Sequence, residues 1–506
     1  MKNPTIFLPL VAMAAGAYAQ QAQRPNIVYI MTDDHTAQML SAYGNSPVQT
    51  PNLDRIAQDG VLFRNSFVAN SLSGPSRACM LTGKHSHKNG FTNNEHGIFD
   101  GSQQTMPKLM QQAGYQTALI GKWHLVSTPT GFDYFEILHG QGEYYNPDFI
   151  QMDGTTQQAQ GYCTNIITDK AIRWMEQRDR QKPFILFVHH KACHRDWLPE
   201  LKYMREYENQ TFAKPANFND RWEGRPAAQQ QEMSIASQHD MALAYVNRQS
   251  PEDQQTYWAF HDSLSCDFFR RFPQYRNYTE DSPQNDAVTD WKYQRYMRDY
   301  AKDTKSLDDE VGRLLDYLKA NDLYDNTLIV YTSDQGFYMG EHGWFDKRFM
   351  YEESLNTPLL MHLPKGLKRR GEIQEMVQNI DYAPTFLELA GAKIPADIQG
   401  QSLVPVLRGE KQLAKWRDAI YYHFYEYPAE HSVKRHYGVR TNRYKLIHFY
   451  NDIDTWELYD LQEDPTEMHN LYGDPAYAKV QKQMHARLKQ LQKQYDDNIE
   501  QTLTKK

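Results

Sequence analysis

Four short runs of mostly apolar residues end abruptly in polar residues. The runs cover residues 27–31, 117–120, 184–188 and 328–331, and none alternates regularly between apolar and polar positions. Continuous runs of this length are typical of strands that are buried on both faces of a parallel sheet. Because ligands bind outside the carboxyl ends of the strands in such sheets, we expect the polar residues after these runs to meet at one edge.

Helical patterns lie between these runs. Thr50 followed by Pro51 predicts the start of a helix, and Gly60 predicts its end. A second apolar stripe at helical spacing precedes the last run, at Leu307, Val311, Leu314, Leu315 and Leu318. Residues from about 200 to 300 are polar with weak periodicity, so we interpret them as an insertion. Together these patterns predict an α/β fold with a mostly parallel sheet sandwiched by helices.

The composition changes after Gly391, where several prolines and glycines cluster. Beyond this cluster, short segments at 419–422, 437–440 and 444–447 are typical of an antiparallel sheet. A final helix is predicted by an apolar face that comprises Val480, Met484, Leu488, Leu491 and Tyr495. We therefore expect a large α/β domain at 20–395 and a small C-terminal α+β subdomain at 396–506.

The amino-terminal residues have the form of a secretory leader. Lys2 precedes an apolar stretch at 6–16, and Ala17-Tyr18-Ala19 has the small-x-small pattern that a signal peptidase cuts after. The sequence therefore predicts a signal peptide at 1–19 and export, most simply to the periplasm. The chain has no second apolar run of about 20 residues, so no membrane span is expected.

Charge and cysteine content exclude other classes of partner. The formal net charge is -8 and no long basic run occurs, which argues against a nucleic-acid partner. The 4 cysteines are scattered without a Cys-x-x-Cys pair, so a zinc site is not expected. Disulfide bridges are open to an exported chain, but a protein of this length does not need them to fold.

Oxygen donors follow two of the predicted strands. Asp33 and Asp34 come after the first run, and Asp334 and Gln335 come after the last. Carboxylate and amide oxygens suit Ca²⁺ or Mg²⁺ rather than zinc. Either pair alone is typical of a solvated loop, but two pairs at one sheet edge favour a metal site.

Basic residues are expected at the same edge. They are Arg77, Lys122, Lys347 and Arg348, together with His124 and His194. Each of the lysines alone is typical of a surface charge, but gathered around a dication they indicate an anionic substrate group such as a sulfate or phosphate ester. Ser73 precedes a helix that we expect from about Ser76, and the free N–H groups of a helix start favour an anion.

The stretch around Ser73 carries a family resemblance. Ser73-Gly74-Pro75-Ser76-Arg77 with Leu81-Thr82-Gly83 resembles the signature of the type I sulfatases. Two more blocks are similar to blocks of that family, Gly121-Lys122-Trp123-His124 and Ser333-Asp334-Gln335-Gly336. The resemblance extends from about residue 25 to the C-terminal helix. It implies an alkaline-phosphatase-like catalytic domain with a smaller C-terminal subdomain.

The resemblance also implies how the site residues act. In this family the first residue of the pentapeptide, here Ser73, is oxidised by a maturase to formylglycine (3-oxoalanine), whose hydrated aldehyde is the nucleophile. A plain serine would form a sulfate ester with no second hydroxyl to expel the sulfate. The resemblance places Ca²⁺ on Asp33, Asp34, Asp334 and Gln335. It gives the following roles: Arg77 holds the hydrate, Lys122 and Lys347 bind sulfate, His194 is the general acid, and His124 is the base or the orienting group for sulfate elimination.

The substrate is inferred from the residues around Lys347. Asp346 and Arg348 flank this lysine and offer hydrogen bonds to adjacent sugar hydroxyls, and His436 of the C-terminal subdomain is expected to close the site. With the segment at 142–147, these residues resemble the bacterial branch that removes 6-O-sulfate from N-acetylglucosamine in host glycans. Two alternatives remain open: a phosphate or phosphonate ester hydrolase of the same superfamily, and a non-catalytic protein that binds sulfated glycans with Ser73 unconverted.

Overall fold

A ten-stranded sheet forms the centre of the chain, in the order β11-β2-β10-β9-β1-β8-β4-β5-β6-β7. The computed structural model describes residues 24–237, 263, 268, 270–275, 285–410, 413 and 416–499. The predicted signal peptide at 1–19 and much of the predicted insertion lie outside these residues. The bounds of the sheet strands are β1 (Asn26–Thr32), β2 (Val61–Phe63), β4 (Gln116–Gly121), β5 (Tyr134–Leu138), β6 (Asp148–Ile150), β7 (Thr156–Gln158), β8 (Phe184–His189), β9 (Thr327–Ser333), β10 (Leu359–His362) and β11 (Gly371–Ile373).

The predicted strands are the central ones of this sheet. β9, β1, β8 and β4 are neighbours and run parallel, with Thr32 of β1 opposite Ser333 of β9 and Met31 opposite His189 of β8. Their carboxyl ends are therefore level with one another at a single edge. The predicted α/β fold class is confirmed, and the antiparallel pairs of β10 make the sheet mixed rather than purely parallel.

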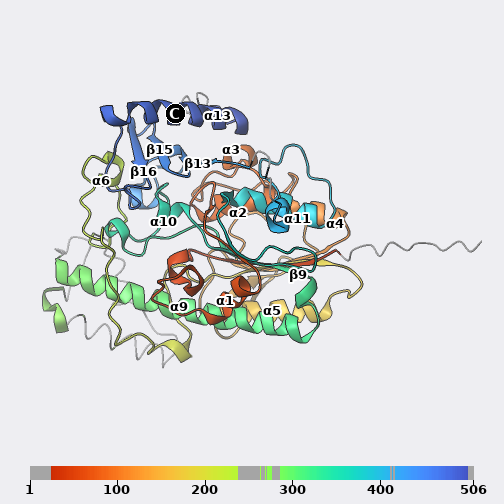
Figure 1. The fold of residues 1–506 in the computed structure, drawn as a ribbon. Coiled ribbons are helices and arrows are strands. Elements are labelled where there is room, and N and C mark those ends of the chain that lie inside the picture. The colour runs from red at the N-terminus through yellow and green to blue at the C-terminus, as the bar shows by residue number, and fades with distance from the viewer. Residues whose placement is uncertain are drawn as a thin grey trace, which may run out of the picture.

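Helices cover both faces of the sheet (Figure 1). Side chains of β1 alternate between the two layers: Val28 and Ile30 pack in one core cluster, and Ile27, Tyr29 and Met31 pack in the other. The first layer holds α1 (Pro51–Gln58), α5 (Cys163–Gln177) and α9 (Asp286–Ala320). The second layer holds α2 (Ser73–Thr82), α4 (Met106–Gln112), α11 (Tyr382–Leu389) and α12 (Val404–Arg408).

Helix α9 is longer than the sequence pattern predicts. The pattern indicates a helix only from Leu307, whereas α9 begins at Asp286 and has 35 residues. The side chain of Asn285 caps its start by accepting a hydrogen bond from the backbone N–H of Val288. The first half is buried through tyrosines at helical spacing, Tyr293, Tyr296 and Tyr300. Interspersed charged residues make this half look like a polar insertion, but several of them are paired inside the protein.

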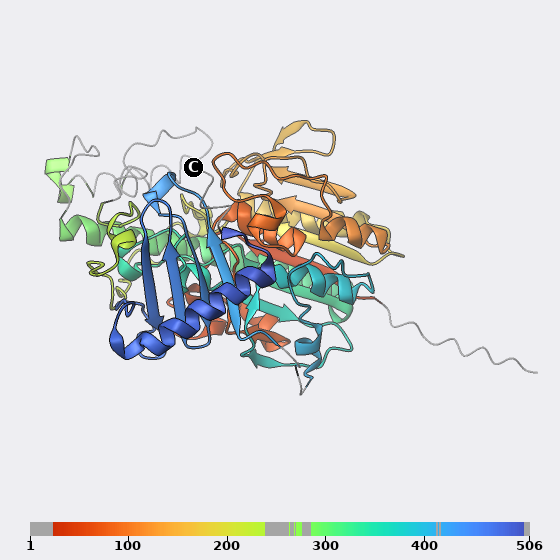
Figure 2. The ribbon, with the colours of Figure 1, turned by 90° about the horizontal axis from the view of Figure 1, so that it is seen from above.

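The C-terminal subdomain is a four-stranded antiparallel sheet covered by one helix (Figure 2). Its elements are β13 (Ala419–Phe424), β14 (His436–Thr441), β15 (Tyr444–Phe449), β16 (Thr455–Asp460) and α13 (Ala478–Tyr495). The predicted apolar face of α13 packs on this sheet. The predicted boundary at 395 falls too early, because Leu403, Val406 and Leu407 of the α12 region pack in the core of the large domain. The structural junction lies between α12 and β13.

Short elements complete the described chain: α3 (Ser86–Asn89), α6 (Pro226–Gln229), α10 (Glu352–Leu355), β3 (Ser66–Phe67) and β12 (Val377–Gln378). Cys79, Cys163 and Cys193 are buried free thiols, and Cys266 lies outside the described residues. Among the helices that the structure describes, none combines the length and the apolar character needed to cross a membrane.

Candidate active site

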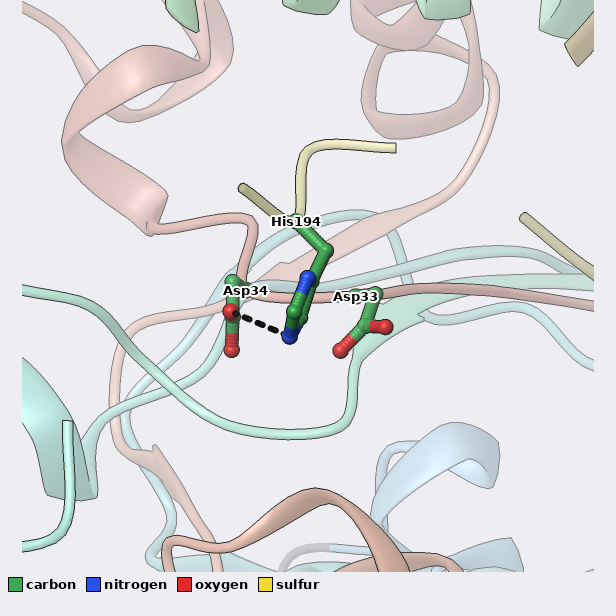
Figure 3. Close-up of side chains that lie close together, drawn as sticks. All are labelled: Asp33, Asp34 and His194. Carbon is green, nitrogen blue, oxygen red and sulfur yellow. Dashed lines mark ion pairs between the residues drawn. The ribbon is translucent and has the colours of Figure 1, made fainter. Parts of the chain in front are cut away.

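The four predicted metal ligands lie together at the carboxyl ends of two neighbouring strands. Asp33 and Asp34 follow β1, and Asp334 and Gln335 follow β9. Because these strands pair in register, the backbone N–H of Asp34 donates to Oδ1 of Asp334 at 3.2 Å. All four side chains are buried. Asp33 and Asp34 also lie beside His194, whose Nε2 is 3.8 Å from Oδ2 of Asp34 (Figure 3).

The donor set fits a hard divalent cation. Among the described residues, Oε1 of Gln335 is a buried amide oxygen with no hydrogen-bond partner, while its Nε2 donates to Oδ1 of Asp34 at 2.5 Å. A buried polar atom without a partner costs free energy, and a cation that it ligates removes that cost. Three carboxylates next to this free amide oxygen offer an oxygen-rich environment of the kind that Ca²⁺ prefers.

Each carboxylate of this cluster also faces a cationic side chain. Asp334 accepts from Nε and Nη2 of Arg77 at 3.1 and 2.9 Å. Asp33 pairs with Lys122, and Asp34 with Lys347 at 2.7 Å. The charges of these three pairs cancel, so a bound dication would leave the cluster positive. A positive, buried cluster favours an anionic substrate group.

The pKa values of the acids reflect this crowding. Burial, together with the negative charges of Asp33 and Asp34, raises the pKa of Asp334 to about 7. Burial alone would also raise the pKa of Asp33, but Lys122, His194 and Arg77 hold it well below its usual value. Burial lowers the pKa of Lys122 to about 8. A bound cation would lower the repulsion among these crowded carboxylates and stabilise their ionised forms.

Ser73 lies at the start of α2 beside the acidic cluster. The helix begins at Ser73 rather than at about Ser76, because the backbone N–H of Ser76 already donates to the carbonyl of Leu72 at 2.9 Å. Pro75 fits in this first turn, where a backbone N–H has no helical partner in any case. The Ser73 hydroxyl donates to Oδ1 of Asp33 at 3.3 Å. Ser73 is therefore directly next to the carboxylates that the sequence predicts as metal ligands.

Lys122 and His124 follow β4 on a tight turn. Gly121 has a φ of 104°, and a Cβ atom there would overlap the backbone carbonyl of His189, so only glycine fits. His124 itself has a φ of 57°, an uncommon conformation for a histidine that places its ring beside Lys122. Burial and then the charge of Lys122 lower the pKa of His124 well below its usual value, so the ring is neutral.

His194 has a fixed ring orientation. Its Nδ1 lies 2.7 Å from the carbonyl of Arg195, to which it donates, and this leaves Nε2 facing Asp34 and Asp33. Burial and then Lys122 hold the pKa of His194 well below its usual value. A general acid must carry a proton on Nε2, so this role requires the negative charge of a bound substrate to raise the pKa. The neighbouring His189 supports the carbonyl of Lys122 at 3.1 Å and is structural.

Asp346, Lys347 and Arg348 lie on a strained loop. Asp346 and Arg348 have φ angles of 75° and 90°, which non-glycine residues rarely adopt. Nε of Arg348 lies 3.0 Å from Oδ2 of Asp346, so the two predicted sugar ligands form a buried ion pair. In this conformation Lys347 contacts Asp34 of the acidic cluster, and Asp346 lies between Lys347 and Arg348.

The C-terminal subdomain adds charged residues that the sequence motifs do not reveal. Glu426, Glu430 and His431 lie between β13 and β14. Glu426 and Glu430 pair with Arg348 at 3.4 and 3.0 Å, and Nε2 of His431 lies 3.6 Å from Oδ2 of Asp346. Arg195 also pairs with Glu430. No local pattern marks these residues, because they reach the site only through the packing of the two domains.

His436 does not contact the site as expected. It lies in β14, is fully buried and stacks against Tyr422 and Phe424. Its Nε2 accepts from the backbone N–H of Met350 at 3.1 Å, and its Nδ1 donates to the carbonyl of Lys434 at 2.8 Å. Both ring nitrogens are therefore occupied by the backbone, and His436 supports the loop after Arg348 from behind. His431 is the histidine of this subdomain that faces Asp346.

Family comparisons agree with this geometry. A family model described as Sulfatase matches residues 25–392, and a model of the C-terminal part of N-sulphoglucosamine sulphohydrolase matches residues 340–494. The chain belongs to the sulfatase family. It is therefore a sulfuric ester hydrolase, as the resemblance around Ser73 predicts.

Individual relatives extend over nearly the whole chain. An N-acetylglucosamine-6-O-sulfatase of Bacteroides thetaiotaomicron is 51% identical over 98% of this chain and 92% of its own length. A solved structure of BT4656 in complex with its substrate D-glucosamine-2-N,6-O-disulfate is 51% identical, has a TM-score of 0.87 and matches 94% of this chain and 99% of its own. A delta 4,5-hexuronate-2-O-sulfatase of B. thetaiotaomicron is 26% identical over 92% of this chain and 88% of its own length. Substrates thus differ among distant members of the family.

Proposed function

We propose that this sulfatase is exported and removes the 6-O-sulfate of N-acetylglucosamine in host glycans, with a formylglycine derived from Ser73 and a calcium ion. The observation that carries the chemistry is the meeting of Ser73, three cationic side chains and the acidic cluster at one sheet edge. The choice of sugar rests on the relative that is 51% identical and named an N-acetylglucosamine-6-O-sulfatase.

Lys122, Lys347 and Arg77 are the anion clamp of this proposal. Lys122 follows β4, which lies on one side of β1 in the sheet, and Lys347 lies on the loop between β9 and α10, on the other side; both lysines are buried. Because both lysines are buried, water screens their charges on the sulfate less than at the surface, and they need no reorganisation as charge shifts in the transition state. A bound calcium ion would neutralise further negative charge on the sulfate oxygens.

Ser73 and two histidines carry the covalent and proton-transfer roles. Formylglycine at position 73 would supply a nucleophile that can release the sulfate again, which a serine hydroxyl cannot. His194 presents Nε2 to the site and protonates the departing sugar oxygen once substrate binding has raised its pKa. His124 is neutral and accepts a proton during sulfate release.

Asp346 and Arg348 bind sugar hydroxyls beside the sulfate. Their ion pair is buried and is held by Glu426 and Glu430 from the second domain. A charged pair with fixed orientation discriminates strongly between a hydroxyl that reaches it and one that points elsewhere. We therefore expect the site to distinguish the gluco from the galacto configuration at C4.

Sulfate release from two epimers tests the proposed substrate. The enzyme should turn over 6-sulfated N-acetylglucosamine much faster than 6-sulfated N-acetylgalactosamine. Asp346→Asn is the matched variant, since it keeps the shape and removes the charge, and it should reduce the discrimination between the epimers. A preference for the galacto epimer contradicts the proposed hydroxyl contact.

The mass of the peptide that contains position 73 tests the proposed nucleophile. Conversion of serine to formylglycine removes two hydrogens, so active protein from the native host should contain a correspondingly lighter peptide. An unmodified Ser73 in fully active native protein contradicts the mechanism and favours a different nucleophile. Unmodified Ser73 in native protein that binds sulfated glycans without turnover favours the non-catalytic alternative.

Export rests on the sequence of the leader alone. Sequencing the amino terminus of the native protein should give Gln20 as the first residue, because the cleavage pattern ends at Ala19. Recovery of a chain that still begins at Met1 from the cytoplasm contradicts export.

A further inference from the structure

We propose that Gln141 holds the place of the substrate's sulfate oxygen between Lys122 and His124, and that substrate displaces it. This inference rests on the proposed function, which gives Lys122 and His124 their roles. It adds a residue that regulates access to both groups, and no motif in the sequence marks Gln141.

The amide of Gln141 joins the two groups directly. Its Oε1 accepts a hydrogen bond from Nζ of Lys122. Its Nε2 lies 3.0 Å from Nε2 of His124 and is the donor there, since an amide nitrogen cannot accept. The His124 proton is then on Nδ1, which is buried and has no hydrogen-bond partner among the described residues. The Gln141 amide thus pairs at once with the Lys122 ammonium and with the lone pair on Nε2 of His124, both of which the proposed reaction needs.

Substrate requires the same positions. A sulfate oxygen is an acceptor, as is Oε1 of Gln141, so both compete for the N–H groups of Lys122. Lys122 is fully buried, whereas the Gln141 side chain is exposed. Gln141 therefore lies on the solvent side of Lys122, and an anion that arrives from solvent reaches Nζ after the amide has moved aside. His124 likewise regains a free lone pair when the amide leaves.

The segment that carries Gln141 is built to move. It follows β5 at residues 139–143, and His139, Gly140, Gln141 and Glu143 are all exposed. Gly140 and Gly142 flank Gln141 with φ angles of 56° and 74°, conformations that glycine adopts without strain. A Cβ at Gly140 would meet nothing within 4 Å, so this side of the turn is open. Gly142, in contrast, lies against the buried side chain of Leu138, so rotation at Gly140 is what moves Gln141 away from Lys122.

Two contacts define the resting position of this turn. The backbone N–H of Gly142 donates to the carbonyl of His139 at 2.9 Å, and Nζ of Lys191 donates to the carbonyl of Gln141 at 3.4 Å. Both involve the backbone, so replacing the side chain of Gln141 leaves them intact. The effect of a substitution at position 141 can therefore be assigned to loss of the side-chain amide, since the conformation of the turn is kept.

The contact with Gln141 also explains how the protein tolerates the buried Lys122. Without a partner beyond Asp33, Lys122 would hold a desolvated charge with unsatisfied N–H groups. Gln141 supplies the missing acceptor until the sulfate arrives. Because Gln141 competes with sulfate for Lys122, the apparent affinity for sulfate equals the intrinsic affinity multiplied by the fraction of protein in which the amide has left Lys122.

Binding of inorganic sulfate tests the inference without depending on the sugar or on Ser73. Titration calorimetry of the full chain with added calcium compares the wild type with Gln141→Ala and Gln141→Glu. Gln141→Ala should bind sulfate about three- to tenfold more tightly, since one competing hydrogen bond is removed. Gln141→Glu should bind at least about tenfold more weakly, because a carboxylate pairs with Lys122 and repels sulfate.

His139→Ala is the matched control, because it lies on the same exposed turn outside the segment 142–147 and should leave sulfate affinity unchanged. In turnover assays Gln141→Ala should lower KM by a larger factor than it changes kcat, which a merely structural residue would not do. Equal or weaker sulfate binding by Gln141→Ala overturns the inference and makes Gln141 a part of the working pocket. If the wild type itself binds no sulfate, the clamp and the proposed function are wrong as well.

Discussion

Replacing Lys347 by methionine tests its role in catalysis when the variant is compared with a second buried ion pair. Methionine keeps the approximate length of the side chain and removes its charge. Asp34 and Asp346 then lose the same ammonium group, which lies 2.7 Å from Asp34 and 3.6 Å from Asp346. Burial alone would lower the pKa of Lys347, but Asp34 and Asp346 raise it above its usual value. Lys347 is therefore charged at every pH of a normal assay, and the effect of removing it should not depend on pH.

The expected magnitudes follow from the burial of this pair. Removing one partner of a buried ion pair costs about 3–5 kcal/mol of folding stability, since the remaining charge is left desolvated. Loss of one preorganised donor to a developing charge lowers kcat by about 10²–10³-fold, equivalent to about 2.7–4 kcal/mol in the transition state. Lys347→Met should therefore be both less stable and much less active than the wild type.

Arg417→Met is the matched control for this variant. Arg417 pairs with the buried Asp381 at 2.6 and 2.7 Å, and both residues lie apart from the acidic cluster. The two variants should lose comparable stability in denaturant unfolding, whereas only Lys347→Met should lose kcat when both are assayed fully folded. A similar loss of kcat in both variants would make Lys347 a structural residue and refute its role in the clamp.

Three further predictions concern the metal, a buried acid and the second domain. Removing divalent ions with a chelator should abolish turnover and lower the melting temperature, and calcium should restore both; full activity in protein shown by metal analysis to be calcium-free contradicts the acidic site. Burial raises the pKa of Asp303 to about 7, although Tyr144 and Tyr162 donate hydrogen bonds to its carboxylate. Because the folded state favours protonated Asp303, its contribution to stability is present below about pH 4 and is lost as the pH rises to about 7, a change of up to about 4 kcal/mol. Asp303→Asn should therefore gain denaturant resistance relative to the wild type at pH 8 but not at pH 4, and equal gains at both pH values contradict the shifted pKa. Finally, both His431→Ala and His436→Ala remove buried rings and should lower stability, but only His431→Ala should also raise KM for the sulfated sugar, since His431 faces Asp346; a higher KM for His436→Ala alone restores His436 as the sugar ligand.

Much of the fold was predictable because its signals are local. The strand at 327–333 is a continuous apolar run, and the turn after it carries Asp334 and Gln335 at fixed positions. In α9 the same reasoning found the apolar stripe at Leu307–Leu318 but missed the first half of the helix. That half is buried through tyrosines and through charged side chains that form ion pairs, and the sequence alone does not show that a charged residue has an oppositely charged partner inside the protein. The domain boundary was placed too early for a different reason: the prolines and glycines after Gly391 suggested a linker, but the apolar residues of α12 beyond them pack in the core of the large domain.

The sequence by itself determined the chemistry: Ser73 in its pentapeptide, and the acids and bases that directly follow buried strands. Parallel strands align their ends, so local order along the chain is enough to bring these groups to one edge. Tertiary structure alone decided what surrounds them. Gln141 reaches Lys122 and His124 from a separate turn, and His431 rather than His436 faces Asp346, because contacts between loops depend on how domains pack and leave no periodic or local signal in the sequence.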